Sequence, residues 1–275
     1  MSSATVDILL YHDIARDEEE ARRLSNPLFT TPLPRFKAHL QWLRRSRYKP
    51  IRLNEWLDAR LQGERWQGKY VLLTFDGPHT GWFEYVFPLL VEMEIPATFF
   101  IIAGWVGPRH AFPESRHLRW EHIERIETLR GKKGKQLFDI GSHSMWHTTL
   151  DKKASENNAE YRKRMSEEIV EATRLIRNRT GCPVRTYASP EGAGDRTALA
   201  PLFRLAGLEA VRWAGYPGRM NVFMQDFWDL DISYCDTTNQ MVDQLSIVLS
   251  NKWLAFFKRA RRRAVAEMRQ WLIRL

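Results

Sequence analysis

The chain has 275 residues, 44% of them hydrophobic and 12% aromatic, so it can bury one large core or two small ones. Cys182 and Cys235 are not part of any CxxC motif, which argues against a disulfide framework or a cysteine zinc site. The longest nearly apolar run, residues 95–107, is too short for a membrane-crossing helix. The formal net charge is +9, and residues 252–275, with eight Lys or Arg and one Glu, carry seven of these charges.

Strand-like and helix-like segments alternate along most of the chain. The predicted strands are residues 7–12, 70–75, 97–102, 137–140, 184–189 and 209–214. The predicted helices are residues 34–46, 54–61, 82–94, 118–130, 159–181 and 196–207. Apolar strands separated by helices predict an α/β fold with a parallel sheet covered on both faces, either a barrel or a doubly wound sheet.

Polar side chains follow four of these predicted strands. His12 and Asp13 end the first, Asp76 follows the second, the stretch "GSHSMWH" follows 137–140, and "PEGAGD" follows 184–189. Because functional residues of α/β folds gather at the carboxyl ends of the strands, we expect an active site there.

His143 and His147 form the most informative pair in that set. Two imidazoles directly after a strand, joined by a carboxylate from another strand end, would suit Zn²⁺ or a similar divalent ion with open positions. The alternative, that both are loop histidines bonded to backbone, stays open at this point because an i,i+4 spacing alone is weak support.

The segments "YVLLTFDGPHTG", "IPATFFIIAGWVG", "FDIGSHSMWHTTL" and "YASPEGAGD" resemble, in order and spacing, the motifs of the NodB-homology polysaccharide deacetylases, carbohydrate esterase family four. The opening "ILLYHDI" looks most like the branch that deacetylates poly-N-acetylglucosamine. The resemblance covers roughly residues 8–232.

The resemblance implies a distorted (β/α) barrel, to which we assign residues 1–250. Residues 251–275 lie beyond the resemblance, and we assign them to a basic amphipathic helix. It also implies metal-dependent hydrolysis of an N-acetyl group on a sugar or polysaccharide. The expected cofactor is a divalent metal, zinc first, with cobalt or nickel as alternatives. In the family, the first Asp of a "TFDD" pair is the general base, and the second binds the metal with two His of an HxxxH motif. His143 and His147 correspond to that motif, and His12 corresponds to the acid that protonates the leaving amine.

This sequence has one aspartate where the family has two, since Asp76 is followed by Gly77. If the strand register is held, Asp76 is the base and the metal loses its oxygen ligand. If the loop is held, Asp76 is the ligand and the base is missing. We favour the second alignment slightly. His79, Glu191 and Asp195 are possible substitutes, although each is also an ordinary loop residue.

The third motif supplies the predicted substrate contacts Tyr187, Pro190 and Glu191. Glu191 stands where the family often has a sugar-stacking ring. No His occurs after His147, so His12 is the remaining candidate acid.

The basic tail, residues 252–275, has Trp and Phe at helical spacing among its cations. This pattern predicts peripheral contact with an anionic membrane; nucleic acid is a weaker alternative, and a helix packed on the barrel needs no partner. The first residues lack the basic and apolar regions of a secretory signal, so we expect a cytoplasmic protein, either free or held peripherally at the inner membrane face. The expected partner of the protein is an N-acetylated saccharide.

The second hypothesis for the function is a catalytically silent barrel that binds carbohydrate or scaffolds polysaccharide assembly.

Overall fold

The structure is a computed structural model that describes residues 4–24, 27–107, 116–213, 221–222, 226–231 and 234–235. All of them belong to one compact unit. The predicted boundary at residue 250 and the predicted helix at 251–275 lie outside the described residues. None of the helices in the described part of the chain has the length and apolar character needed to cross a bilayer.

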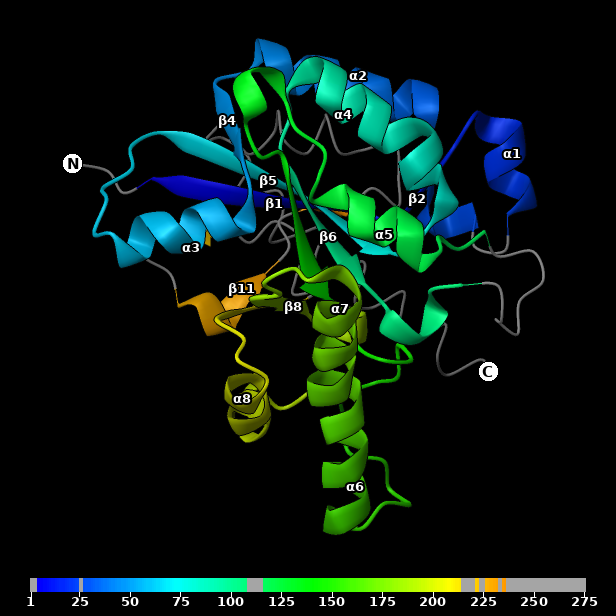
Figure 1. Ribbon diagram of the computed structural model, residues 1–275, viewed down its shortest axis with the longest axis vertical. Helices are drawn as coiled ribbons and strands as arrows, with labels where there is room; N and C mark the ends of the chain where they lie inside the picture. The colour runs from blue at the N-terminus through cyan, green and yellow to red at the C-terminus, as the bar shows by residue number, and fades with distance from the viewer. Residues whose placement is uncertain are drawn as a thin grey trace, which may run out of the picture. The chain divides into compact units, whose positions relative to one another are not determined.

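A mainly parallel sheet of ten strands forms the centre of this unit (Figure 1). Along the sheet the strands are β10 (Asn221–Val222), β1 (Thr5–Tyr11), β5 (Lys69–Gly77), β6 (Ala97–Ile101), β7 (Phe138–Ser142), β8 (Thr186–Ala188), β9 (Ala210–Trp213) and β11 (Leu230–Asp231). In addition, β4 (Tyr48–Ile51) pairs with β5, and β12 (Tyr234–Cys235) pairs with β1. A separate two-stranded sheet joins β2 (Asp13–Ala15) and β3 (Thr30–Pro32). The six predicted strands correspond to β1 and β5 to β9, and the parallel α/β sheet is confirmed.

Helices connect these strands, and the six predicted helices are all present. They are α2 (Leu33–Arg45), α3 (Leu53–Leu61), the π-helical η2 (Trp82–Val86) continued by α4 (Phe87–Met93), α5 (Trp120–Ile126), α6 (Asn158–Met165) continued through the π-helical η5 (Ser166–Glu171) into α7 (Ala172–Thr180), and α8 (Arg196–Leu205). A further helix is α1 (Glu18–Arg23), and single 3₁₀ turns are η1 (Pro27–Phe29), η3 (Ala103–Trp105), η4 (Lys132–Gly134), η6 (Pro190–Gly192) and η7 (Phe227–Asp229).

The longest helical stretch runs from α6 to α7, and its ends follow from the sequence (Figure 1). The side chain of Asn157 accepts hydrogen bonds from the first-turn amides of Ala159 and Glu160, which would otherwise lack partners. At the other end Gly181 adopts φ +71°, a left-handed conformation that glycine reaches without a steric penalty. The stretch packs against α5 and β7.

Alternation of side chains divides the strand residues between two cores. The interior of the curled sheet is filled at one end by α3, whose Trp56 is fully buried in a cluster with Leu72, Phe100 and Ala210. On the opposite face Phe75 stacks on Phe99 with ring centroids 4.8 Å apart, and Phe99 packs against Phe87 of α4 at 4.9 Å. Since Asp76 follows Phe75 in β5, its side chain belongs to the interior face.

Candidate active site

The strand register brings four polar side chains to the carboxyl end of the interior. In the β1–β5 ladder Leu10 is paired with Thr74, so His12 follows at the level of Asp76. In the β8–β9 ladder Arg212 is paired with Ala188, whose carbonyl contacts His143. Three of these four side chains, His12, Asp76 and His143, belong to the strand ends that the sequence singled out.

Asp76 forms a buried ion pair with Arg212. The Nη2 atom of Arg212 donates to both carboxylate oxygens of Asp76, at 2.7 Å to Oδ1 and 2.5 Å to Oδ2. Only 4% of Asp76 and 1% of Arg212 are exposed. A buried carboxylate needs such a partner, and two bonds to one guanidinium fix its orientation. Arg212 was not among the predicted site residues, although a charged residue within the apolar strand run "EAVRWA" was a usable signal.

His143 faces the other side of the same carboxylate. Its Nδ1 lies 2.8 Å from the carbonyl oxygen of Ala188, which can only accept, so Nδ1 carries the proton. Burial lowers the pKa of His143 well below 6.5, so the ring is neutral and Nε2 holds a lone pair. Nε2 lies 3.4 Å from Oδ2 of Asp76, so two acceptor atoms stand close together.

This pair of acceptors fits a metal ion. Two tetrahedral ligands of zinc lie roughly 3.4 Å apart, because each metal–ligand distance is roughly 2.1 Å. A backbone carbonyl on the remote imidazole nitrogen is also the usual support for a metal-binding His. Asp76 and His143 could therefore hold a divalent cation between them.

His147 is close to this pair but is not aligned with it. Its ring centroid lies 4.8 Å from that of His143, with the planes nearly perpendicular at 79°. Burial lowers its pKa, while the charges of Asp76 and Glu191 oppose the shift. As the side chains lie, no three His, Cys, Asp or Glu groups among the described residues converge as a metal site. The role of His147 as third ligand stays a prediction.

His12, the predicted acid, is neutral in this environment. Burial lowers its pKa to about 3, an effect that Asp76 opposes and that His79, His143 and Arg212 reinforce. The Phe29 ring packs edge-to-face against the imidazole of His12, with ring centroids 4.7 Å apart. At neutral pH, His12 must therefore take up a proton before it can give one to a leaving nitrogen.

His79 lies directly beside the strand end. A Cβ added to Gly77 would come within 2.4 Å of the Cδ2 atom of His79 and 2.7 Å of the Trp82 ring. Burial lowers the pKa of His79 to about 4. Its Nδ1 lies 4.0 Å from Oδ2 of Asp13, whose own pKa burial raises to about 7. The space that a side chain at position 77 would need is thus occupied by the His79 and Trp82 rings.

The three predicted substrate contacts of the third motif differ in burial. Tyr187 shares its side of the sheet with Ser142 rather than with His143, and it is fully buried against Phe203. Pro190 is also buried, which leaves Glu191, exposed and at φ +54°, as the member of the predicted trio that a sugar could reach. Strand alternation directs Tyr187 away from His143, and Pro190 lies buried at the start of η6. Their roles as substrate contacts stay predictions.

Asp195, a possible substitute for the missing aspartate of the TFDD pair, has a structural role. Its Oδ1 accepts hydrogen bonds from the amides of Thr197 at 2.9 Å and Ala198 at 3.1 Å, which caps α8. A capping carboxylate is engaged by the helix and is a poor candidate for a general base.

The fold defines the class of protein. The structure superposes on a de-N-acetylase from Aggregatibacter actinomycetemcomitans with a TM-score of 0.71 at 18% identity, covering 87% of this chain and 99% of that one. The match to IcaB from Ammonifex degensii has a TM-score of 0.68 at 21% identity, covering 90% and 99% of the two chains. At these identities the likeness concerns the fold, which is the (β/α) barrel of the deacetylase type.

The family follows from the sequence itself. The profile of the polysaccharide deacetylases matches residues 64–211, and the chain belongs to that family. It is 22% identical over 192 residues to the poly-beta-1,6-N-acetyl-D-glucosamine N-deacetylase of Escherichia coli K12, covering 60% of this chain and 28% of that protein. It is 25% identical over 183 residues to the enzyme of that name from Staphylococcus aureus MRSA252, covering 63% and 57%. The chain thus spans less than two thirds of these relatives.

Proposed function

We propose that this protein hydrolyses N-acetyl groups on an acetamido sugar or polysaccharide with the help of a divalent metal, zinc first. The observation that carries the proposal is the 3.4 Å approach of Asp76 Oδ2 to His143 Nε2, in a member of the polysaccharide deacetylase family. A bound metal would polarise the amide carbonyl and lower the pKa of a bound water.

The chain's own residues would do the rest. Arg212 holds the Asp76 carboxylate in one orientation, and the Ala188 carbonyl holds the His143 ring in one tautomer. Asp76 either binds the metal or accepts a proton from water. His12, at the same end of the barrel, would supply the proton for the leaving nitrogen once it has acquired one itself.

Acetate release from N-acetylglucosamine oligomers, measured with Zn²⁺, Co²⁺ or Ni²⁺ added, tests the proposal. We expect activity that chelators remove and that His143→Ala with His147→Ala abolishes together with metal binding. Asp76→Asn separates the two possible roles of the carboxylate. If Asp76 is a ligand, metal occupancy falls with activity; if it is the base, activity falls while the metal stays bound.

A silent barrel that binds carbohydrate or scaffolds polysaccharide assembly is the second candidate. It is favoured by the single aspartate and by the His79 ring that crowds Gly77. The two candidates differ in a simple measurement. Wild-type protein that binds metal stoichiometrically, binds N-acetylated oligosaccharides and releases no acetate would establish the second.

The proposal extends to the location of the protein on the basis of sequence alone. Residues 252–275 would hold a cytoplasmic enzyme against the anionic inner face of a membrane. Deleting them should abolish salt-dependent binding to anionic vesicles and leave the melting temperature of the barrel unchanged. A truncated protein that no longer folds would show instead that the segment belongs to the core.

A further inference from the structure

The loop between His143 and His147 has a costly backbone conformation. Ser144 has φ +75° and His147 has φ +59°, both left-handed and neither a glycine. For a residue with a Cβ this conformation is less favourable than an ordinary one. The hydroxyl of Ser144 accepts the amide of His147 at 2.8 Å, but this single local bond does not offset the cost. Contacts from elsewhere must hold the loop.

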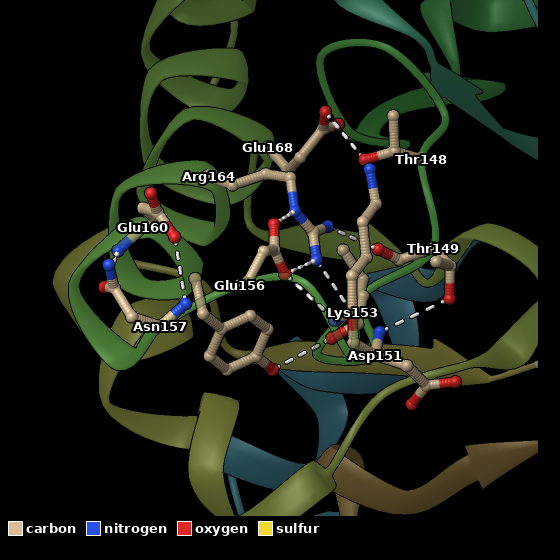
Figure 2. A network of polar contacts seen from close by, with 11 residues as sticks. Thr148, Thr149, Asp151, Lys153, Glu156, Asn157, Glu160, Arg164 and Glu168 are labelled. Carbon is tan, nitrogen blue, oxygen red and sulfur yellow. Dashed lines mark hydrogen bonds and ion pairs between the residues drawn. The ribbon is translucent and has the colours of Figure 1, made fainter.

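Glu168, on the π-helical turn η5, supplies three of these contacts. Its Oε2 accepts the backbone amides of Met145 at 3.1 Å and Trp146 at 3.0 Å. Its Oε1 accepts the hydroxyl of Thr148 at 3.0 Å, and Figure 2 shows these two side chains joined. Successive amides around one anion form a nest, here filled by a carboxylate of the same chain that is 2% exposed.

Arg164, one helical turn before Glu168, holds the chain just beyond the loop. It donates to the carbonyl oxygens of Thr149 at 2.6 Å and Asp151 at 2.8 Å (Figure 2). Its guanidinium is fixed in turn by both oxygens of Glu156. Arg164 therefore binds carbonyl groups, and Glu168 binds amide groups, of the segment that contains His147.

The other side of the loop is bound to η3. The amide of Ala103 donates to the carbonyl of Ser144 at 3.0 Å, and the amide of Gly104 donates to that of Met145 at 2.8 Å. The loop thus lies between two rigid elements. Among the groups that hold the loop, Glu168 is the buried carboxylate. Burying it carries a desolvation cost that an apolar residue at the same helix position would avoid.

We propose that Glu168 is a positioning residue that fixes the backbone from Met145 to Thr148 and thereby sets where His147 stands relative to His143. The inference rests on the proposed metal-dependent function, in which both imidazoles are ligands. Glu168 does not touch the site itself and acts through the loop. Without it, the left-handed residues relax and the two imidazoles lose their common geometry.

Two measurements test this on the full-length protein. Co²⁺ affinity, from titration of the visible absorption of the bound ion, reports the geometry of the imidazoles. Hydrogen exchange of a peptide covering residues 145–148 in metal-free protein reports the loop. For Glu168→Ala we expect Co²⁺ binding about 10- to 100-fold weaker, the range for residues that orient metal ligands, together with faster exchange.

The conservative variant distinguishes positioning from charge. Glu168→Gln keeps an oxygen for the two amides and offers an N–H to the Thr148 hydroxyl, which can also accept. We therefore expect both readouts to stay close to wild type. Glu167→Ala is the matched control: it removes the same charge one residue away, from a side chain that accepts the Trp146 indole rather than loop backbone. It should leave Co²⁺ affinity unchanged.

Co²⁺ affinity and exchange rates of Glu168→Ala equal to those of wild type would overturn the inference. If wild type binds no Co²⁺, the metal-dependent function fails, and the exchange data alone decide whether Glu168 holds the loop. If Glu168→Ala does not fold, Thr148→Val removes one contact from the loop side. Loss of one hydrogen bond should speed exchange about fivefold, and an unchanged rate contradicts the proposal.

Discussion

The imidazole of His79 fills the space that a side chain at position 77 would need. A Cβ on Gly77 would lie 2.4 Å from His79 Cδ2, far inside van der Waals contact. A side chain at position 77 therefore requires the His79 ring to move.

Gly77→Ala should consequently lower the free energy of unfolding by about 1–3 kcal/mol, the usual cost of overpacking a buried site. Adding His79→Ala should recover part of the loss, because the nearest contact is removed, while the Trp82 contact at 2.7 Å remains. Urea unfolding of the two single variants and the double variant measures the coupling. Strictly additive effects would show that His79 does not cause the crowding.

The Asp76–Arg212 pair gives a second prediction. Arg212→Met leaves a buried carboxylate without its partner and should cost about 3–5 kcal/mol of stability. Asp76→Asn in that background should recover much of the loss. The control is Arg174→Met, which breaks an exposed ion pair with Glu171 and should cost at most about 1 kcal/mol. Equal losses for the two arginines would mean that burial of the Asp76 pair carries no special cost.

The sequence predicted most of this fold because its signals are local. Apolar runs such as residues 70–75 predict buried strands, and caps such as Gly181 predict where helices end. The strands β2 and β3 were not found, because each has three residues and depends on pairing that no local pattern reveals.

The site was predicted less completely. Motif spacing identified Asp76 and His143. Arg212, the partner of Asp76, lies 136 residues away in the sequence, and Ala188, the partner of His143, lies 45 residues away. Only the strand register brings each pair together. Glu168 lies on a helix rich in charged residues, and such a pattern predicts that its carboxylate faces solvent. Its burial depends on how that helix packs over the loop, which spacing does not encode.

Asp139 provides a test by pH. Its buried carboxyl accepts from Arg52 Nη1 at 2.6 Å and from the amide of Asn54 at 2.9 Å, yet burial outweighs both and raises its pKa from 3.8 to about 6. Between these values the native state holds a proton that the unfolded state has lost. The contribution of Asp139 to stability is thus complete below about pH 4 and falls as the pH rises through 6.

The stability of wild type relative to Asp139→Asn should therefore drop by roughly 3 kcal/mol between pH 4 and pH 7, since one unit of pKa corresponds to about 1.4 kcal/mol. Urea unfolding at several pH values gives the difference. Asp58→Asn, at a partly exposed ion pair with Arg185, serves as the surface control. Parallel curves for wild type and Asp139→Asn would rule out a raised pKa at Asp139.

Gly104 should be as sensitive as Glu168, because it supports the same loop from the other side. A Cβ at this position would meet the Trp146 ring at 2.5 Å and the carbonyl oxygen of Met145 at 2.6 Å. Gly104→Ala must push the loop away from η3, and we expect Co²⁺ affinity to fall about tenfold or more.

Since Gly104→Ala and Glu168→Ala would disturb one loop, their effects on affinity should not add: the double variant should be little worse than the poorer single variant. Titration of the four proteins under one set of conditions provides the comparison. Additive losses would mean that the two residues act on His147 by separate routes, and that the loop from Ser144 to Thr148 does not move as a unit.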